Sequence, residues 1–381
     1  MLRIIKIAFF IIFFIKKQDI TKNCLILHIE MNRVDVLTGS ERYKFLVGDC
    51  LTVMKMMEDE SVNCIITSPP YWGMRRYDND NDVHEVGNED TFEEYVHKLT
   101  SIFSEAKRVL VKDGSLWLNI GDKYNNKELM GMPWRVAISL MDQGGWILRN
   151  DVIWNQLKGT QSCKDRLRDS YEHIFHFVKT KKYYYDADAI RIKPTLKPKV
   201  TKDSTISSTG VSGKKYRSQI ENSADLSSDE KAAALEALDS TLMDIRMGKL
   251  NDFRMTIRGV QRAWHSESTE ISGRARELQE KGFYIMRIGS NGHLPTDIWD
   301  IVPEDTWRKD SHCAVFPEEL LRIPILATCP EDGVVLDPFS GTGSTVAAAL
   351  KLKRRGIGIE LSKEYNENAK KRVEKIGLML L

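Results

Sequence analysis

Short runs of apolar residues recur along this chain, and several of them end in Gly-Asp or just before a proline. Such runs predict β-strands at residues 44–49, 62–67, 115–120, 146–154, 173–178, 333–337 and 356–360. Apolar residues at helical spacing predict helices at residues 92–110, 134–141 and 345–351, with a last helix after Ser362. Strands that alternate with helices are typical of βαβ units. We therefore expect an α/β fold, a doubly wound and mainly parallel sheet with helices on both faces.

The middle of the chain has a different pattern. Residues 191–217 hold eight basic residues and one acid, separated by Ser, Thr, Gly and Pro. A helical stretch follows at 228–247, and basic residues then recur every three to five positions. A solvated surface insertion would also have this composition, but aromatic residues lie among the basic ones, which favours contact with nucleic acid. The residues that we expect to contact it are Lys214, Lys215, Arg217, Arg258 and Arg262.

These patterns divide the chain into four parts. We expect residues 31–190 and 291–381 to form two halves of one α/β domain, with a smaller domain at 191–290 inserted between them. Residues 1–30 contain a continuous apolar run flanked by Lys and Arg. As a helix this run would rise only about 13 Å, which is too short for a bilayer core of about 30 Å. We expect residues 1–30 to be a leader outside the fold, with an ordered extra element or a membrane or export signal as the alternatives.

Composition adds little about function. The chain has 56 Lys and Arg against 54 Asp and Glu, so any basic surface must come from local concentration of charge. The six cysteines form no C-x-x-C pair and no histidine stands at zinc-finger spacing, so structural zinc is not expected. Few cysteines in a chain of this length indicate reduced thiols and a cytoplasmic protein.

The predicted strand at 333–337 leads into a glycine-rich turn, Pro338–Gly343, that opens a helix. Glycines allow a sharp turn and the close approach of a ligand. Glu360 ends the next strand, where an acid can accept both ribose hydroxyls of a nucleoside. Val346 stands at the third glycine position of a dinucleotide motif and no Gly-Lys-Ser/Thr follows, so a phosphate ligand is not required. Taken alone, the turn would also be compatible with a dehydrogenase.

Ser68-Pro69-Pro70-Tyr71 follows the predicted strand at 62–67. The exocyclic amino nitrogen of cytosine or adenine is a poor nucleophile, because its lone pair is conjugated with the ring. The Ser68 hydroxyl and the Pro69 carbonyl are suited to accept both N–H groups and so favour a reactive, pyramidal nitrogen. The prolines hold the loop extended, and Tyr71 offers a flat face for a base taken out of the duplex. The loop therefore predicts direct methylation of an amino nitrogen.

Methylation of a ring carbon would instead need a reactive thiol at the end of a strand. Cys64 lies inside an apolar strand and Cys329 precedes Pro330, so both have the pattern of packing cysteines. His173 and His176 also lie in an apolar strand, which favours structural roles.

In this order, the motifs resemble the amino-methylating DNA methyltransferases of permuted (β) motif order. The resembling segments are Gly48-Asp49, Thr67–Trp72, Leu116–Asp122, His312–Pro317, Asp337–Ser344 and Gly358–Glu360. The resemblance implies a seven-stranded, Rossmann-like sheet that binds S-adenosylmethionine over the glycine-rich turn, with Glu360 on the ribose and Asp49 near the adenine. The cofactor-binding residues that it implies are Asp49, Asp337, Pro338, Phe339, Ser340, Gly341, Gly343 and Glu360.

The resemblance further implies that Ser68, Pro69, Pro70 and Tyr71 hold a flipped base and that residues 191–290 are a target-recognition domain for double-stranded DNA. Family members often work beside a restriction endonuclease of matching specificity. Serine at position 68 is common in the N4-cytosine branch and also occurs among N6-adenine enzymes, so we expect cytosine N4, with adenine N6 as the alternative. Two competing hypotheses are an RNA methyltransferase of the same fold and a catalytically inactive DNA-binding protein.

Overall fold

A computed structural model describes residues 41–73, 85–157, 163–202, 204–260, 273–303 and 317–377. The expected leader at 1–30, Arg262 and most of the His312–Pro317 segment lie outside these ranges. The chain divides into two compact units, one made of Met1–Asp186 with Thr296–Leu381 and the other of Ala187–Pro295. We call them the sheet unit and the inserted unit.

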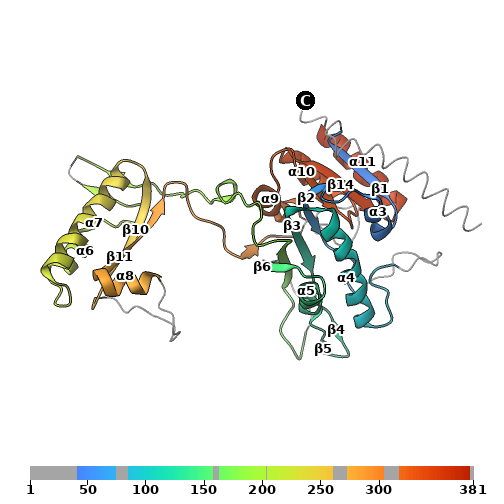
Figure 1. Ribbon diagram of the computed structural model, residues 1–381, viewed down its shortest axis with the longest axis horizontal. Coiled ribbons are helices and arrows are strands. Elements are labelled where there is room, and N and C mark those ends of the chain that lie inside the picture. The colour runs from blue at the N-terminus through green and yellow to red at the C-terminus, as the bar shows by residue number, and fades with distance from the viewer. Residues whose placement is uncertain are drawn as a thin grey trace, which may run out of the picture. The chain divides into compact units, whose positions relative to one another are not determined.

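Within the described residues, the sheet unit is built on one sheet of eight strands in the order β1-β14-β13-β2-β3-β7-β6-β12 (Figure 1). The strands are β1 (Tyr43–Val47), β2 (Val62–Thr67), β3 (Leu110–Ile120), β6 (Ile147–Asn155), β7 (Tyr171–Val178), β12 (Ile298–Asp300), β13 (Val334–Asp337) and β14 (Arg355–Glu360). The expected number of seven is therefore wrong. The additional short strand, β12, pairs in parallel with β6 at one edge of the sheet.

Strand direction determines which loops lie together. Five neighbouring strands are mutually parallel, so their carboxyl ends share one edge of the sheet. In sheet order they are β1, β14, β13, β2 and β3. By contrast, β7 runs antiparallel to both β3 and β6. The beginning of β7 therefore lies at the edge where the parallel strands end. A short hairpin of β4 (Tyr124–Asn125) and β5 (Glu128–Leu129) follows β3 at the same edge.

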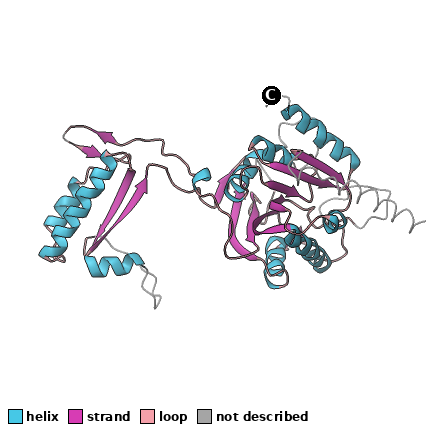
Figure 2. Ribbon diagram, turned by 45° about the horizontal axis from the view of Figure 1, so that its top comes forward, coloured by secondary structure: helices cyan, strands magenta, loops and turns pink. Residues whose placement is uncertain are grey.

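Helices cover both faces of the sheet, as expected for a doubly wound fold (Figure 2). One core contains residues of α3 (Cys50–Met56), α4 (Phe92–Val109) and α5 (Met132–Asp142), and the other contains residues of α9 (Glu318–Thr328) and α10 (Ser344–Lys351). Successive residues of β2 alternate between them, since Ile65 packs in the first core and Ile66 in the second. The last helix, α11 (Lys363–Gly377), packs through Ala369 and Val373 against Phe45 and α10.

The α4 helix illustrates how the sequence forms these layers. Its first turn has a capping box, in which the Thr91 side chain accepts from the Glu94 N–H and the Glu94 side chain accepts from the Thr91 N–H. Tyr95, Leu99 and Phe103 follow at helical spacing and are buried. This spacing directs one apolar stripe onto the sheet.

The inserted unit has its own small core. Its described elements are the 3₁₀ turn η1 (Asp188–Ile190), the hairpin β8 (Lys199–Val200) and β9 (Thr205–Ile206), the helices α6 (Lys214–Glu221), α7 (Ser228–Arg246) and α8 (Gly273–Lys281), and the antiparallel pair β10 (Leu250–Ile257) and β11 (Phe283–Gly289). Phe253 and Ile257 of β10 pack against Leu238 and Ile245 of α7. Across the described parts of both units, no helix combines the length and apolar character that a membrane span requires.

Candidate active site

The loops that follow β2 and β13 begin side by side. The two strands are adjacent and parallel, with Leu336 opposite Ile65. Thr67, the last residue of β2, donates a hydrogen bond of 2.7 Å to Asp337, the last residue of β13, across 270 positions of sequence. The Ser-Pro-Pro-Tyr loop and the glycine-rich turn are thus joined at their first residues by a buried hydrogen bond.

The carboxylate of Asp337 lies inside the protein beneath the glycine-rich turn. It accepts three hydrogen bonds, from the hydroxyls of Thr67 and Thr345 and from the N–H of Phe339. Burial raises the pKa of Asp337 to about 6, although these hydrogen bonds act in the opposite direction. Because its oxygens are occupied by these donors, Asp337 is suited to hold the turn in place.

The turn itself depends on two glycines in the left-handed region, Gly341 at φ +50° and Gly343 at φ +77°. A Cβ atom at Gly343 would lie 2.9 Å from the ring of Phe45, so close packing also requires glycine there. Apart from its chain neighbours, a Cβ at Gly341 would meet no atom of the described residues within 4 Å. Beside it, the Ser340 hydroxyl is buried and has no hydrogen-bond partner among the described residues. The turn therefore has an open position at Gly341 and, at Ser340, a buried hydroxyl that no described residue satisfies.

Glu360 is the last residue of β14, and Asp49 follows the end of the neighbouring strand β1 at the same edge. The Glu360 carboxylate accepts from the N–H of Gly341 at 2.8 Å and from the N–H of Ser362 at 2.9 Å. The N–H of Gly48 donates to the Glu360 carbonyl at 3.0 Å, which joins the ends of β1 and β14. Asp49 is exposed and caps α3 through its side chain. The ends of β1, β14 and β13 thus bring together the residues that the sequence predicts to bind the cofactor.

The Ser-Pro-Pro-Tyr loop is held from two sides. The Tyr95 hydroxyl on α4 donates to the Pro70 carbonyl at 3.0 Å. The Tyr71 ring lies against Gly121, where a Cβ atom would approach it to 2.7 Å, so the strand end must be glycine. The Ser68 hydroxyl donates to the Tyr71 oxygen at 3.3 Å. The predicted catalytic residues therefore lie in one fixed loop at the end of β2.

Three polar side chains that the sequence analysis did not single out complete this site. Glu172, in β7, accepts from the Tyr71 hydroxyl at 2.6 Å and from the Asn119 amide at 2.7 Å, both on Oε2. Gln156 donates to Oε1 of Glu172 at 2.7 Å. The signal available in the sequence was a single acid near the start of an otherwise apolar strand, Tyr171–Val178.

The two cysteines with the pattern of packing residues, Cys64 and Cys329, are not suited to act as nucleophiles. Cys64 and Cys329 are fully buried. Burial raises the pKa of Cys64 to about 12, and burial likewise raises the pKa of Cys329. Both thiols therefore stay protonated, and a covalent mechanism through either of them is disfavoured.

The two histidines of β7 have structural contacts. His173 lies 2.8 Å from Asp151 of the paired strand. His176 is buried, contacts the Ser115 hydroxyl at 3.0 Å and stacks on Trp117. Among the described residues, no group of three His, Cys, Asp or Glu side chains is arranged to hold a metal ion.

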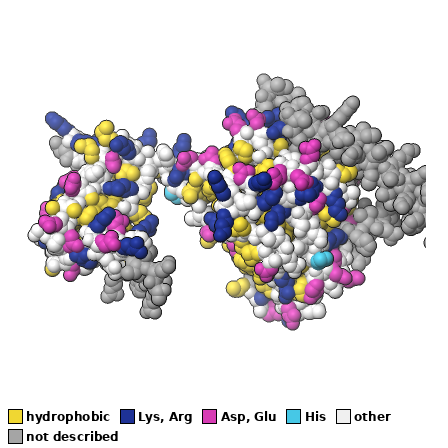
Figure 3. All heavy atoms as spheres, viewed as in Figure 1, with side chains coloured by type: hydrophobic (Ala, Val, Ile, Leu, Met, Phe, Trp, Pro, Cys, Tyr) yellow, Lys and Arg dark blue, Asp and Glu magenta, His cyan; other side chains and the backbone are white. Residues whose placement is uncertain are grey.

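The basic residues predicted to contact nucleic acid have different surroundings in the inserted unit. Lys214 and Lys215 are exposed at the start of α6. Arg217, one turn later, forms an ion pair with Asp239 of α7. Figure 3 shows Lys and Arg interspersed with Asp and Glu on the visible face of this unit. Lys214 and Lys215 are the better placed of these residues to meet a polyanion.

Arg258 lies at the end of β10 and is engaged inside the unit. Its guanidinium donates to the Glu230 carboxylate at 2.7 Å and to the carbonyls of Asp225 and Gln279. These bonds join β10, α7 and α8, which favours a structural role for Arg258.

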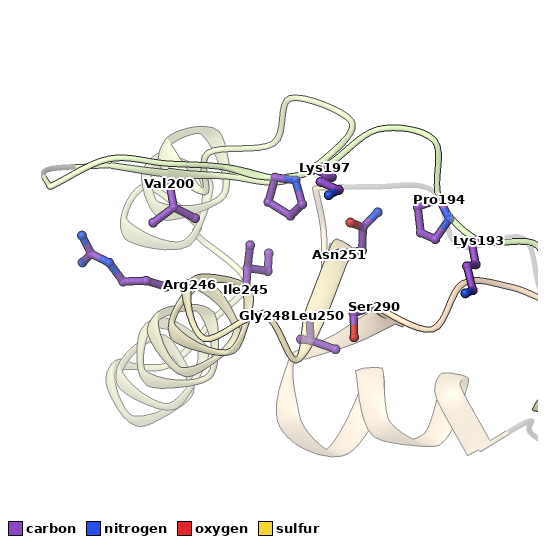
Figure 4. Close-up of a pocket in the computed structure, with 11 residues that line it drawn as sticks. Lys193, Pro194, Lys197, Val200, Ile245, Arg246, Gly248, Leu250, Asn251 and Ser290 are labelled. Atoms are coloured by element: carbon purple, nitrogen blue, oxygen red, sulfur yellow. The ribbon is translucent and has the colours of Figure 1, made fainter.

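A pocket of about 450 Å³ lies within the inserted unit (Figure 4). Lys193 and Lys197 line it from the segment before β8, and Arg246 from the end of α7. Arg246 also donates to the carbonyls of Thr201 and Lys202 and so supports the β8–β9 hairpin. The lining of this pocket therefore contains three basic side chains, Lys193, Lys197 and Arg246.

The chain is similar to DNA methyltransferases in sequence. The N6/N4 methyltransferase family model, described as DNA methylase, matches residues 62–371. The type II methyltransferase M.SfiI of Streptomyces fimbriatus is 30% identical, over 85% of this chain and 89% of that protein. The type II methyltransferase M.SmaI of Serratia marcescens is 28% identical, over 87% of this chain and 90% of that protein.

Among solved structures, the cytosine-N4-specific PvuII DNA methyltransferase has a similar fold, with a TM-score of 0.53 at 18% identity. The match covers 88% of this chain and 90% of that one.

Proposed function

The chain belongs to the N6/N4 family of DNA methylases, and on that premise we propose that it methylates N4 of cytosine at a specific site in duplex DNA, within a restriction–modification system. The hydrogen bond between Thr67 and Asp337 is the observation that carries the proposal. It joins a loop suited to the amino group of a base to a turn suited to a nucleoside cofactor. A methyl donor and a methyl acceptor bound at these loops would be neighbours.

The methyl donor of this family is S-adenosylmethionine, whose sulfonium supplies an electrophilic methyl group when the cofactor is bound. The glycine-rich turn fits such a ligand, because the position above Gly341 is open and the buried Ser340 hydroxyl lacks a partner among the described residues. Glu360, whose carboxylate already fixes the turn, is suited to accept the ribose hydroxyls. Asp49 and Phe339, at the same sheet edge, would hold the adenine.

Ser68, Pro69, Pro70 and Tyr71 would hold the base. The Ser68 hydroxyl and the Pro69 carbonyl would each accept one N–H of the amino group and localise its lone pair. The bond from Tyr95 to the Pro70 carbonyl fixes the loop before the base arrives, so little ordering remains to be done on binding. The Tyr71 ring would stack on the extruded base.

Direct transfer to the amino nitrogen agrees with the state of the thiols. A ring-carbon mechanism needs a thiolate, whereas Cys64 and Cys329 are buried and protonated. Serine at position 68 favours cytosine N4, because serine is common there in the N4 branch that the sequence resembles. Adenine N6 is the other outcome that the test below distinguishes.

The inserted unit, Ala187–Pro295, is suited to recognise the target sequence. It folds around its own core and carries Lys214 and Lys215 exposed on α6. Phosphate contacts by such lysines would position the duplex, while other side chains of the unit would contact base edges. A cognate restriction endonuclease would share the recognition sequence.

Expression of the chain in a bacterial host that lacks DNA methylation tests the proposal. Mass spectrometry of nucleosides from that DNA should detect N4-methylcytosine, and sequencing should locate it at one short motif. The Tyr71→Ala variant should bind S-adenosylmethionine and leave the DNA unmodified. N6-methyladenine would change the assigned base, whereas methylated RNA with unmodified DNA, or site-specific DNA binding without any methylation, would refute the proposal.

A further inference from the structure

The hydrogen bonds around Ser68 form a directed chain. The Ser68 hydroxyl donates to the Tyr71 oxygen at 3.3 Å, and the Tyr71 hydroxyl donates to Oε2 of Glu172 at 2.6 Å. Each hydroxyl accepts from one side and donates to the other, and the chain ends at a carboxylate, which accepts only. A proton delivered to Ser68 therefore has a continuous path to Glu172.

The topology explains why Glu172 can end this path. It is the second residue of β7, which runs antiparallel to β3 and therefore begins at the edge where β2 and β3 end. Asn119 and Gln156 donate to opposite oxygens of the Glu172 carboxylate, each at 2.7 Å. These two neutral donors hold the carboxylate in place and leave its negative charge uncancelled.

Tyr71 is suited to pass a proton without keeping a negative charge. Burial, and next the charge of Glu172, raise the pKa of the Tyr71 phenol well above its ordinary value. The phenol thus remains protonated and donates to Glu172. It can release its proton only while it receives another from Ser68.

We propose that Glu172 is the terminal acceptor of the proton that the target amino group loses during methyl transfer, and that this proton travels through Ser68 and Tyr71; the proposal rests on the proposed methylation of an amino nitrogen. As the carbon–nitrogen bond forms, one N–H bond of the base breaks and its proton goes to Ser68 Oγ. The Ser68 proton moves to the Tyr71 oxygen, and the Tyr71 proton moves to Glu172. The nitrogen ends neutral with three bonds, both hydroxyls are restored and Glu172 ends as a neutral acid.

Asn119 supports this arrangement from the side. Its Nδ2 also lies 2.8 Å from the Tyr71 oxygen and 3.3 Å from Ser68 Oγ, so one amide contacts all three members of the path. Its Oδ1 is buried and has no partner among the described residues. An acceptor in that position is suited to a donor on the bound base.

The test compares Glu172→Gln and Tyr71→Phe with the wild-type chain in single-turnover methylation of a duplex that carries the identified site. Gln keeps the shape of Glu172 and one oxygen to accept from Tyr71 and Asn119, and the Gln156 amide can turn its oxygen towards the new NH2 group. Gln cannot take up the proton, and Phe keeps the ring but interrupts the path. Both variants should be slower by about 100-fold or more, which is within the range of general acid–base catalysis. Dissociation constants for the cofactor by calorimetry, and for the duplex by fluorescence anisotropy, should change less than threefold.

Two further measurements separate proton transfer from a structural effect. Wild-type methyl transfer should slow in D₂O, and the two variants should have lost this isotope effect. Glu172→Asp, which retains a carboxylate, should recover part of the rate. Glu128→Gln, a matched change at an exposed position of β5, should leave every value unchanged.

The outcomes distinguish this inference from the proposed function. If the wild-type chain leaves duplex DNA unmethylated, the proposed function fails. If the wild type is active and Glu172→Gln is within threefold of it, or Tyr71→Phe is fully active while Glu172→Gln is not, the relay is refuted. Weakened binding by Glu172→Gln that accounts for its whole rate loss would also refute the relay, since Glu172 would then act on binding.

Discussion

Thr67 and Asp337 are the last residues of adjacent parallel strands, and the hydroxyl of the first donates to the carboxylate of the second at 2.7 Å. The two loops assigned to the base and to the cofactor start directly after this pair, since Ser68 follows Thr67 and Pro338 follows Asp337. Thr345 binds the second oxygen of Asp337 at 2.6 Å and adds the first turn of α10 to the same assembly. The relative position of the base loop and the cofactor turn therefore depends on a few buried hydrogen bonds.

Replacing Thr67 with Val should loosen this connection. The variant removes the donor and leaves a buried carboxylate oxygen with one partner fewer. We therefore expect the free energy of unfolding to fall by about 1–3 kcal/mol. Cofactor affinity, measured by calorimetry on folded protein, should also fall, because the turn is tied to Thr67.

Thr328→Val is the matched control. Thr328 is equally buried and hydrogen-bonded, to Trp117 and to the Pro324 carbonyl, but it lies at the end of α9. Its loss should reduce stability and leave cofactor affinity unchanged. An unaltered affinity in Thr67→Val would show that the turn keeps its position without this bond.

Substituting Gly341 with Ala tests whether the open space above the turn is a binding surface. The left-handed backbone at φ +50° should cost about 1 kcal/mol of stability for any residue with a Cβ. Apart from its chain neighbours, no atom of the described residues lies within 4 Å of the new methyl group, so further loss of stability is not expected. S-adenosylmethionine affinity should fall much more than stability, because the methyl group enters the space assigned to the cofactor.

Gly248→Ala provides the comparison. Gly248 has φ +75°, has open space at its Cβ position and belongs to the inserted unit. The same modest strain should appear in its denaturation curve, with cofactor binding as in the wild type. Equal affinities for the two variants would remove Gly341 from the proposed binding surface.

The sequence predicts the fold class correctly because hydrophobic period and strand-end chemistry agree at most elements. The strand at 62–67 and the helix beginning at Phe92 are observed at the predicted positions. The sequence predicts that the third strand starts at residue 115, five residues later than in the structure, because Gly114 has the pattern of a strand break. In the structure β3 runs through Gly114, where a Cβ would lie within 2.8 Å of Leu110 and the Asn63 carbonyl. Close packing, which a single sequence does not reveal, requires glycine there.

The contribution of Glu172 could not be predicted for a related reason. The apolar pattern identifies the strand, but its direction decides which end reaches the site. Had β7 been parallel to β3, Val178 would lie near Tyr71 in place of Glu172. The eighth strand, β12, was missed because three residues give no measurable periodicity.

Neutralising Lys214 and Lys215 together should lower the affinity for DNA and make that affinity less dependent on salt concentration. If each lysine contacts one phosphate, the slope of log affinity against log salt concentration should fall by about 2 in the double Gln variant. Anisotropy titrations from low to high salt measure this slope. Because the contacts are to phosphate, matched and mismatched duplexes should lose affinity by similar factors.

The control makes the same change of net charge elsewhere. Lys181→Gln with Lys182→Gln neutralises two exposed lysines in the loop after β7, in the sheet unit. This variant should keep the wild-type slope. A wild-type slope in the Lys214 and Lys215 variant would remove both residues from the phosphate contacts, whereas equal losses in both variants would indicate an effect of overall charge.

His176 should make the protein sensitive to acid. Burial lowers the pKa of His176 to about 3 in the folded state, against about 6.5 for an ordinary histidine. The unfolded chain therefore takes up a proton as the pH falls below 6.5, while the folded chain does not until about pH 3. Stability from this group is complete above pH 6.5 and is lost progressively as the pH falls towards 3. Between pH 7 and pH 5 the loss should be about 2 kcal/mol.

Urea denaturation at several pH values, compared with His176→Gln, isolates this contribution. The variant should be less stable at pH 7, because it loses the stacking on Trp117, and its stability should fall less steeply towards pH 5. His97→Gln changes an exposed histidine of α4 and should reproduce the wild-type slope. Identical slopes in all three proteins would mean that His176 takes up its proton equally in the folded and unfolded states, and that the buried imidazole is not what limits stability in acid.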